Sequence, residues 1–150
     1  MAQFCDRLGS AFLALSLAST GAGTGCAPGR ARPPEIPAHP WLATIIDGQP
    51  ADPDVRSTLQ IEGSRIFGSA GCNRYSGRLM PEDQKPDVER VRIAQVAATR
   101  MACPPPRSEQ EERFFGAFGR VEGLRIETGR LLLLGRNGTP LIILVPADRN

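Results

Sequence analysis

The fold is decided by the stretch Gly71-Cys72-Asn73-Arg74-Tyr75-Ser76-Gly77, together with a later segment that supplies a second cysteine, Thr99-Arg100-Met101-Ala102-Cys103-Pro104. We call them the signature loop (71–77) and the cysteine segment (99–104). Gly71 and Gly77 can adopt positive φ angles, and Asn73 can hydrogen-bond nearby backbone in a turn. These residue types predict a tight loop between strands, a structural role that requires no catalysis.

The composition indicates one modest domain. The chain has 150 residues, of which 41% are hydrophobic, enough for one core and too few for two. The formal net charge is +2, and the arginines are scattered along the chain. No basic cluster of the kind that binds nucleic acid is present in the sequence. The single histidine, His39, has no metal-ligating or catalytic partner nearby in the sequence, so we expect no metal, no cofactor and no hydrolase site.

The N-terminus is typical of an exported protein. Residues 1–25 combine Arg7 near the start, an apolar run over 11–18 and small residues before Cys26, which is the pattern of a signal peptide. The apolar run is too short to favour a spanning helix. We expect Cys26 to be lipidated and to become the mature N-terminus, although Gly23 replaces the usual aliphatic residue of a lipobox. Secretion without a lipid anchor is the alternative.

A tether follows the cysteine. Residues 26–40 are rich in proline, glycine and arginine, a composition that disfavours helix and predicts an extended linker. The domain itself is expected over 41–146, with 147–150 as a short C-terminal tail.

Short β-prone runs between turn residues predict an antiparallel meander. They cover 41–46, 57–61, 65–68, 75–80, 88–96, 124–127, 131–134 and 141–145. The acidic, proline-containing stretch 81–87 is expected to be a surface loop. The pair Asn137-Gly138 between two apolar runs predicts a β-hairpin.

One helix is expected after the three prolines at 104–106. Ser108 is placed as its N-cap and Glu111 as the capping-box partner, with the neighbouring glutamates facing water. Its apolar residues recur at helical spacing and should lie on one face, either in the core or lining a groove for lipid: Phe114, Phe115 and Phe118. The fold class is therefore α+β, a curved and mostly antiparallel sheet of about eight short strands with one packed helix.

From Trp41 to Pro146 the chain resembles the META domain, also called the HslJ-like family after a bacterial heat-shock protein. The resemblance rests on motifs in family order: the opening Trp41, the signature loop with Gly71, Asn73 and Gly77, the cysteine segment with Thr99 and Met101, the helix with its phenylalanines, and the closing hydrophobic hairpin. Arg74 and the loop over 81–87 depart from the family pattern.

The resemblance implies an opened-barrel-like fold and a cell-envelope protein linked with heat or envelope stress. It also implies similarity to pilotin lipoproteins, which accept lipid or an apolar peptide. On this basis we expect a non-enzymatic protein that binds or stabilises an envelope protein or lipid. It would be anchored at the outer membrane and face the periplasm, or else be secreted or periplasmic.

Two cysteines remain once Cys5 is cleaved and Cys26 is lipidated. Cys72 and Cys103 would then form an even pair in an oxidising compartment, and a disulfide is the natural expectation. Free buried thiols are one alternative. A thiol-disulfide redox function is another, although redox-active pairs are usually much closer in sequence than these two.

Overall fold

The sheet is built from nine strands, in a computed structural model that describes residues 36–84 and 89–147. The strands are β1 (Trp41–Ile46), β2 (Gln49–Pro50), β3 (Thr58–Glu62), β4 (Arg65–Ser69), β5 (Arg74–Gln84), β6 (Glu89–Ala98), β7 (Gly123–Glu127), β8 (Arg130–Leu134) and β9 (Pro140–Pro146). The helix α1 (Arg107–Phe118) lies between β6 and β7 in the chain. The predicted signal peptide, Cys26 and most of the tether lie outside the described residues, as do residues 148–150.

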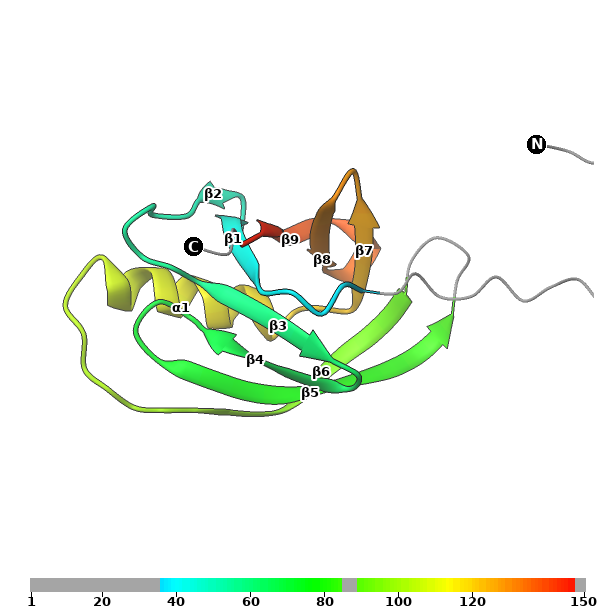
Figure 1. Ribbon diagram of the computed structural model, residues 1–150, viewed down its shortest axis with the longest axis horizontal. Helices are drawn as coiled ribbons and strands as arrows, with labels where there is room; N and C mark the ends of the chain where they lie inside the picture. Colours follow the sequence, from blue (N-terminus) through cyan, green and yellow to red (C-terminus); the bar gives the residue numbers. More distant parts are fainter. Residues whose placement is uncertain (1–35, 85–88, 148–150) are drawn as a thin grey trace, which may run out of the picture. The chain divides into compact units, whose positions relative to one another are not determined.

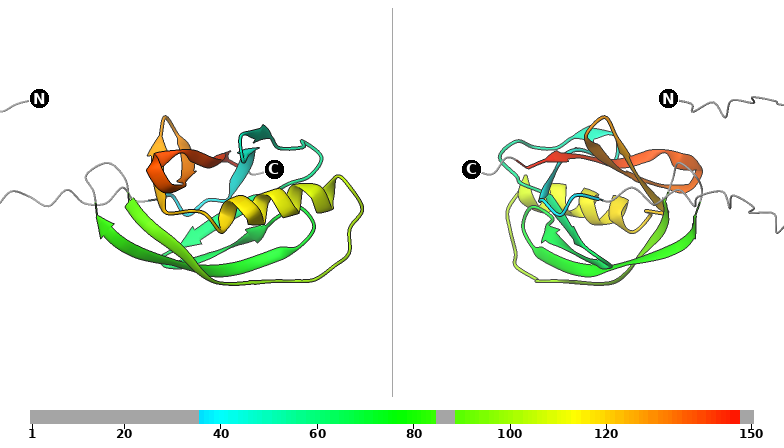
Figure 2. Two further views of the ribbon diagram at one scale, coloured as in Figure 1. Left: turned by 180° about the vertical axis from the view of Figure 1, so that it is seen from behind. Right: turned by 45° about the vertical axis from the view of Figure 1, so that its right-hand side comes forward.

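Every strand pairing is antiparallel, and the pairings close into a ring. The strands follow one another in chain order from β3 to β9, and β1 completes the ring by pairing with both β9 and β3. Figures 1 and 2 show the curved sheet with α1 lying against it. The join between β6 and β7 is short, since only Glu89 and Arg90 pair with β7. The α+β class with one helix and a curved antiparallel sheet is confirmed.

The core lies between α1 and the concave side of the sheet. Phe114 and Phe118 are fully buried there, as is Trp41 at the start of β1. Burying an aromatic side chain of this size contributes about 1.5–3 kcal/mol. The four consecutive leucines of β8, 131–134, are all buried, as expected for a strand without polar alternation. None of the described helices is long and apolar enough to cross a membrane.

Strand β5 runs further than the sequence predicted. Residues 81–84 continue the strand instead of forming a loop, and Pro81 is paired with Val91 of β6. A register irregularity lies between Pro81 and Gln84, and a proline is tolerated in a sheet next to such an irregularity because one ladder hydrogen bond is already lost there. The prediction of a loop over 81–84 was therefore wrong. Residues 85–88 lie outside the described residues.

The predicted hairpin between β8 and β9 is confirmed. Its connection spans 135–139, and both Asn137 (φ 69°) and Gly138 (φ 76°) adopt positive φ angles. Asparagine and glycine are the residues that occupy this conformation at the lowest cost, which explains the strength of the sequence signal.

The predicted capping box is absent from α1. The helix begins at Arg107 with Pro106 in the N-cap position, which has no side-chain cap hydrogen bond. Ser108 thus lies inside the first turn, where it cannot serve as the N-cap. Proline has the φ angle needed at a helix start and lacks the N–H that would need a partner. The carboxylate of Glu111 binds Asn73 instead of the backbone at the helix start.

Candidate functional site

A disulfide joins the signature loop to the cysteine segment. Cys72 and Cys103 are bonded, with their Cα atoms 6.0 Å apart and 31 positions apart in sequence, so the expected disulfide is present. Cys72 is buried and Cys103 is half-buried. The Cys72 Sγ atom lies 3.5 Å from the carbonyl oxygen of Met101. A disulfide sulfur carries no proton, so this is a packing contact.

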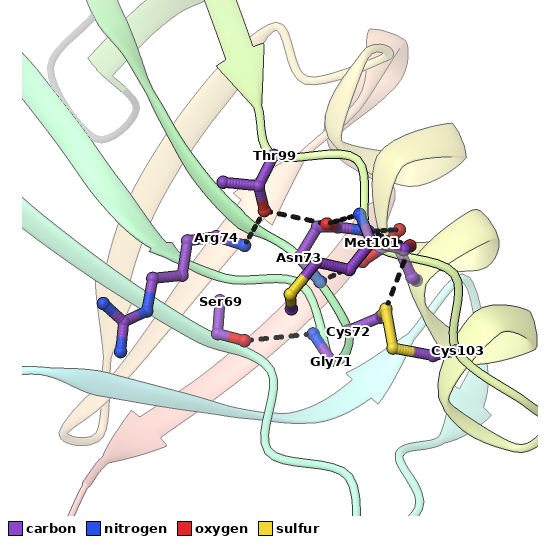
Figure 3. The surroundings of a disulfide bond; sticks show 9 residues. Ser69, Gly71, Cys72, Asn73, Arg74, Thr99, Met101 and Cys103 are labelled. Carbon is purple, nitrogen blue, oxygen red and sulfur yellow. Dashed lines mark hydrogen bonds between the residues drawn. A yellow bond between two sulfur atoms is a disulfide. The ribbon is translucent and has the colours of Figure 1, made fainter.

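Asn73 is the centre of a buried hydrogen-bond network next to the disulfide (Figure 3). Its Oδ1 atom accepts from Thr99 Oγ1 and from the Met101 backbone N–H, both at 2.7 Å. Its Nδ2 atom donates to the Met101 carbonyl at 3.1 Å and to Glu111 Oε1 at 2.8 Å. The amide therefore binds the distant cysteine segment, whereas the sequence predicted a bond within its own turn. That local prediction was wrong.

Glu111 connects α1 to the same network. One carboxylate oxygen accepts from Asn73 Nδ2, and the other accepts from the Asn73 backbone N–H at 2.5 Å. Hydrogen bonds to an ionised group are about twice as strong as neutral ones. The prediction that Glu111 caps the helix and faces water with its neighbours was wrong, because a partner 38 residues earlier competes successfully with the local backbone.

The two glycines of the signature loop have different roles. Gly71 has a φ of 122°, as predicted, and an added Cβ would lie 2.8 Å from Val55. Gly77 does not adopt a positive φ, and that prediction was wrong. It lies within β5, where a Cβ would come within 3.2 Å of the Ala94 carbonyl oxygen and 3.3 Å of Val96. Gly77 therefore provides space beside a β-bulge in the β5–β6 pairing.

Thr99 and Met101 act mainly through their polar groups. Thr99 Oγ1 donates to Asn73 and also accepts from the Arg74 backbone N–H at 3.2 Å. Met101 contributes its backbone N–H and carbonyl, while its side chain is 59% exposed. The network thus fixes the path of the cysteine segment without using the methionine side chain.

The helical phenylalanines surround the only tyrosine of the chain. The ring of Tyr75 lies 5.4 Å from Phe114, 5.9 Å from Phe115 and 5.1 Å from Phe118, measured between centroids. Burial raises the pKa of the Tyr75 phenol well above its usual value, and its hydroxyl donates to the Thr58 carbonyl at 2.9 Å. Phe115 is half-buried, and a lipid groove at these rings stays a prediction.

A second buried network was missed in the sequence. Gln110 is 1% exposed, and its Nε2 atom donates to the Val55 carbonyl at 2.7 Å and to Ser57 Oγ at 3.0 Å. Its Oε1 atom accepts from the Asp52 backbone N–H at 2.6 Å. The signal was available, since Gln110 stands four residues before Phe114 and therefore on the same helical face.

The surface of the described residues includes two open hollows of interest. The larger, of about 760 Å³, is acidic and is lined by Asp47, Gln49, Pro50, Asp52, Pro106, Glu109, Glu112, Arg113 and Gly116. The smaller, of about 340 Å³, lies beside the signature loop and is lined by Asp54, Arg56, Thr58, Ser69, Gly71, Arg74 and Arg107. Neither is lined by the helical phenylalanines.

These features define a class of small domain: a ring-like antiparallel sheet, one packed helix, and a disulfide that joins a strand-connecting loop to the segment before the helix. The META domain matches residues 34–148, and the chain belongs to the META domain family. The chain is also similar to the NMR structure of a protein from Burkholderia xenovorans, with a TM-score of 0.56 and 20% sequence identity. That match covers 75% of this chain and 83% of the other, and it shows the fold alone. No curated protein matches the chain.

Proposed function

We propose that this protein is a non-enzymatic binding module of the cell envelope, tethered to a membrane through a lipid on Cys26. Its META domain would bind or stabilise an envelope protein or lipid, with a role under heat or envelope stress. The observation that carries the non-enzymatic part is that the polar groups of Asn73, in the signature loop, are already bonded within the protein. Both polar atoms of the Asn73 side chain already make two intramolecular hydrogen bonds each.

An asparagine amide has two N–H donors and one oxygen with two lone pairs, and all four are occupied here. Cys72 and Cys103 are bonded to each other, so neither has a free thiol. The one histidine, His39, packs against Trp41 with the two rings tilted by 45° and their centroids 4.3 Å apart, away from the signature loop in the chain. The Asn73 amide and the two cysteines of the motif are thus explained by the stability of the fold, and these groups are not free to contact a substrate.

The geometry favours a structural disulfide over a redox-active one. A disulfide exchanges when a thiolate attacks one of its sulfurs, which requires access, and Cys72 is buried. Three prolines separate Cys103 from Arg107, the first residue of α1, so the helix N-terminus that activates many redox cysteines does not begin at Cys103. The redox alternative predicts that the purified protein reduces a disulfide-bonded test substrate, and the Cys103→Ser variant would abolish that activity.

Localisation is tested by intact mass and fractionation. Protein extracted from the native envelope should have a mass that begins at Cys26 and includes acyl chains, and it should fractionate with the membrane. The Cys26→Ala variant should lose both properties, while the matched Cys5→Ala variant should keep them because Cys5 lies in the cleaved segment. An unlipidated mass beginning elsewhere would refute the anchor.

Binding is tested on the same preparation. Chemical cross-linking in intact cells, followed by quantitative mass spectrometry, should recover one protein or lipid in near-stoichiometric amount with the wild-type chain. A Gly68→Ala variant, whose folded state we expect to be strongly destabilised, should recover less of it. A wild-type preparation that contains no ligand and no cross-linked protein would argue against a binding role.

A further inference from the structure

The smaller hollow beside the signature loop has a lining suited to an anion. Three of its side chains are arginines, Arg56, Arg74 and Arg107, against one carboxylate, Asp54. The formal charge of the lining is therefore three minus one, or +2. The larger hollow has the opposite character, with four carboxylates against one arginine. The linings of the two hollows therefore carry formal charges of opposite sign, although the overall charge of the domain is nearly balanced.

The sheet places three of the lining residues in one row. Thr58 of β3 is directly opposite Ser69 of β4, and Ser69 is directly opposite Arg74 of β5. Directly opposite residues project from the same face of a sheet, with Cβ atoms about 5 Å apart. Two hydroxyls and a guanidinium thus converge on the outer face of the sheet. In Figure 3 the Arg74 side chain extends away from the disulfide.

The two hydroxyls are held by backbone groups that leave their protons free. Thr58 Oγ1 accepts from the Ser69 backbone N–H at 3.1 Å, and Ser69 Oγ accepts from the Gly71 backbone N–H at 3.3 Å. A hydroxyl can both accept and donate. Among the described hydrogen bonds of the chain, neither hydroxyl donates to a protein acceptor, so each can donate to a bound oxygen atom.

Among the described residues, the three arginines of the hollow form no salt bridge. The salt bridges among the described residues involve Arg92, Arg120, Arg125 and Arg136, none of which lines the hollow. Guanidinium groups bind phosphate through paired N–H donors, and convergent arginines are typical of phosphate recognition. Arg107 is also the first residue of the twelve-residue helix α1, whose N-terminus carries a partial positive charge.

We propose that this hollow binds a phosphate group, held by Arg56, Arg74 and Arg107 and by the hydroxyls of Thr58 and Ser69. The group could belong to inorganic phosphate or to a phospholipid headgroup, because both present the same oxygens. The site goes beyond the proposed envelope function and does not depend on lipidation of Cys26.

The first experiment is a titration of the ¹⁵N-labelled full chain, in non-ionic detergent, with inorganic phosphate at constant ionic strength. The backbone amide signals of Ser69, Gly71 and Arg74 should shift and saturate. Arg74→Gln and Arg107→Gln should each weaken binding about tenfold, since each removes a charge-assisted contact. The matched control is Arg130→Gln, an exposed arginine of β8 outside the hollow, which should bind as the wild type does. The same spectra report whether each variant is folded.

The second experiment separates the two sources. Vesicles of phosphatidylcholine, with and without phosphatidate, are tested for sedimentation with the same four proteins. If inorganic phosphate saturates the amide shifts and competes with phosphatidate vesicles, free phosphate is sufficient. If inorganic phosphate causes no saturable shift, but phosphatidate raises binding for the wild type and not for Arg74→Gln or Arg107→Gln, the headgroup is the ligand. No arginine-dependent response in either experiment, or an equal loss in Arg130→Gln, would overturn the proposal.

Discussion

Replacing Asn73 by alanine removes the side chain on which the signature loop, the cysteine segment and α1 converge. Four hydrogen bonds of the side chain are lost, and one of them is the bond from Nδ2 to the carboxylate of Glu111. Glu111 then keeps only the backbone donor of residue 73. The backbone N–H of residue 73 is unchanged and can still donate to Glu111.

The expected cost follows from these contacts. A neutral hydrogen bond contributes about 1 kcal/mol net, and one to a charged group about 1.5–3 kcal/mol. The simple sum is about 5 kcal/mol. Thr99 and Met101 are exposed residues, so water can replace part of the loss, and bonds in one network are not additive. We expect Asn73→Ala to lower the free energy of unfolding by about 3 kcal/mol, a large share of a small domain's stability.

The assay is urea unfolding of the full chain with the disulfide intact, followed by tryptophan fluorescence. With a slope of about 1.5 kcal/mol per M, a loss of 3 kcal/mol moves the midpoint by about 2 M. The matched control is Gln60→Ala, an amide on β3 whose Nε2 atom donates to Glu62 on the exposed surface. It should cost less than about 0.5 kcal/mol.

A loss for Asn73→Ala no larger than that of the control would refute the reasoning. It would mean that the network contributes no more than a solvated amide does, and the signature loop would then need a different explanation.

Three further predictions concern the glycines, the tyrosine and the disulfide. Gly68→Ala should lose about 3 kcal/mol or more, because its Cβ would lie 2.0 Å from a backbone oxygen, whereas Gly116→Ala on the open side of α1 should gain about 0.5–1 kcal/mol; urea unfolding measures both. Burial raises the pKa of Tyr75, so its phenol ionises near pH 10 in the unfolded chain but stays neutral at that pH in the folded chain. Stability should therefore fall by about 1.4 kcal/mol per pH unit above that pH, and Tyr75→Phe should remove this slope. Cys72→Ser should cost about 3–4 kcal/mol, the loop-closure value for 31 positions, as should reduction of the wild type.

Each prediction has an outcome that contradicts it. Equal midpoints for the two glycine variants would show that the close approach at Gly68 does not limit packing. If the free energy of unfolding fell equally with rising pH in the wild type and in Tyr75→Phe, the phenol would ionise without unfolding. If the reduced wild type were as stable as the oxidised chain, the disulfide would not contribute to the free energy of unfolding.

The strands and the hairpin could be predicted because their signals are local. Apolar alternation, the turn glycines and the pair Asn137-Gly138 each specify backbone geometry within a few residues. The same holds for the burial of Phe114 and Phe118, whose spacing defines a helical face.

The errors arose where a distant partner overrides the local rule. Glu111 fits a capping box by spacing, but it binds Asn73 instead. Pro81 and its acidic neighbours resemble a loop, yet pairing with β6 extends the strand. Nothing in a single sequence states which distant segment will supply such a partner, so the contacts of Asn73 could be found only in the folded chain.

The Asn73 network also bears on how the disulfide forms. Its hydrogen bonds run between residues next to Cys72 and residues just before Cys103. Non-covalent folding can therefore bring the two thiols together before any oxidant acts. An oxidant would then join two thiols that are already aligned. A chain that loses Asn73 should consequently oxidise slowly, even where its cysteines are intact.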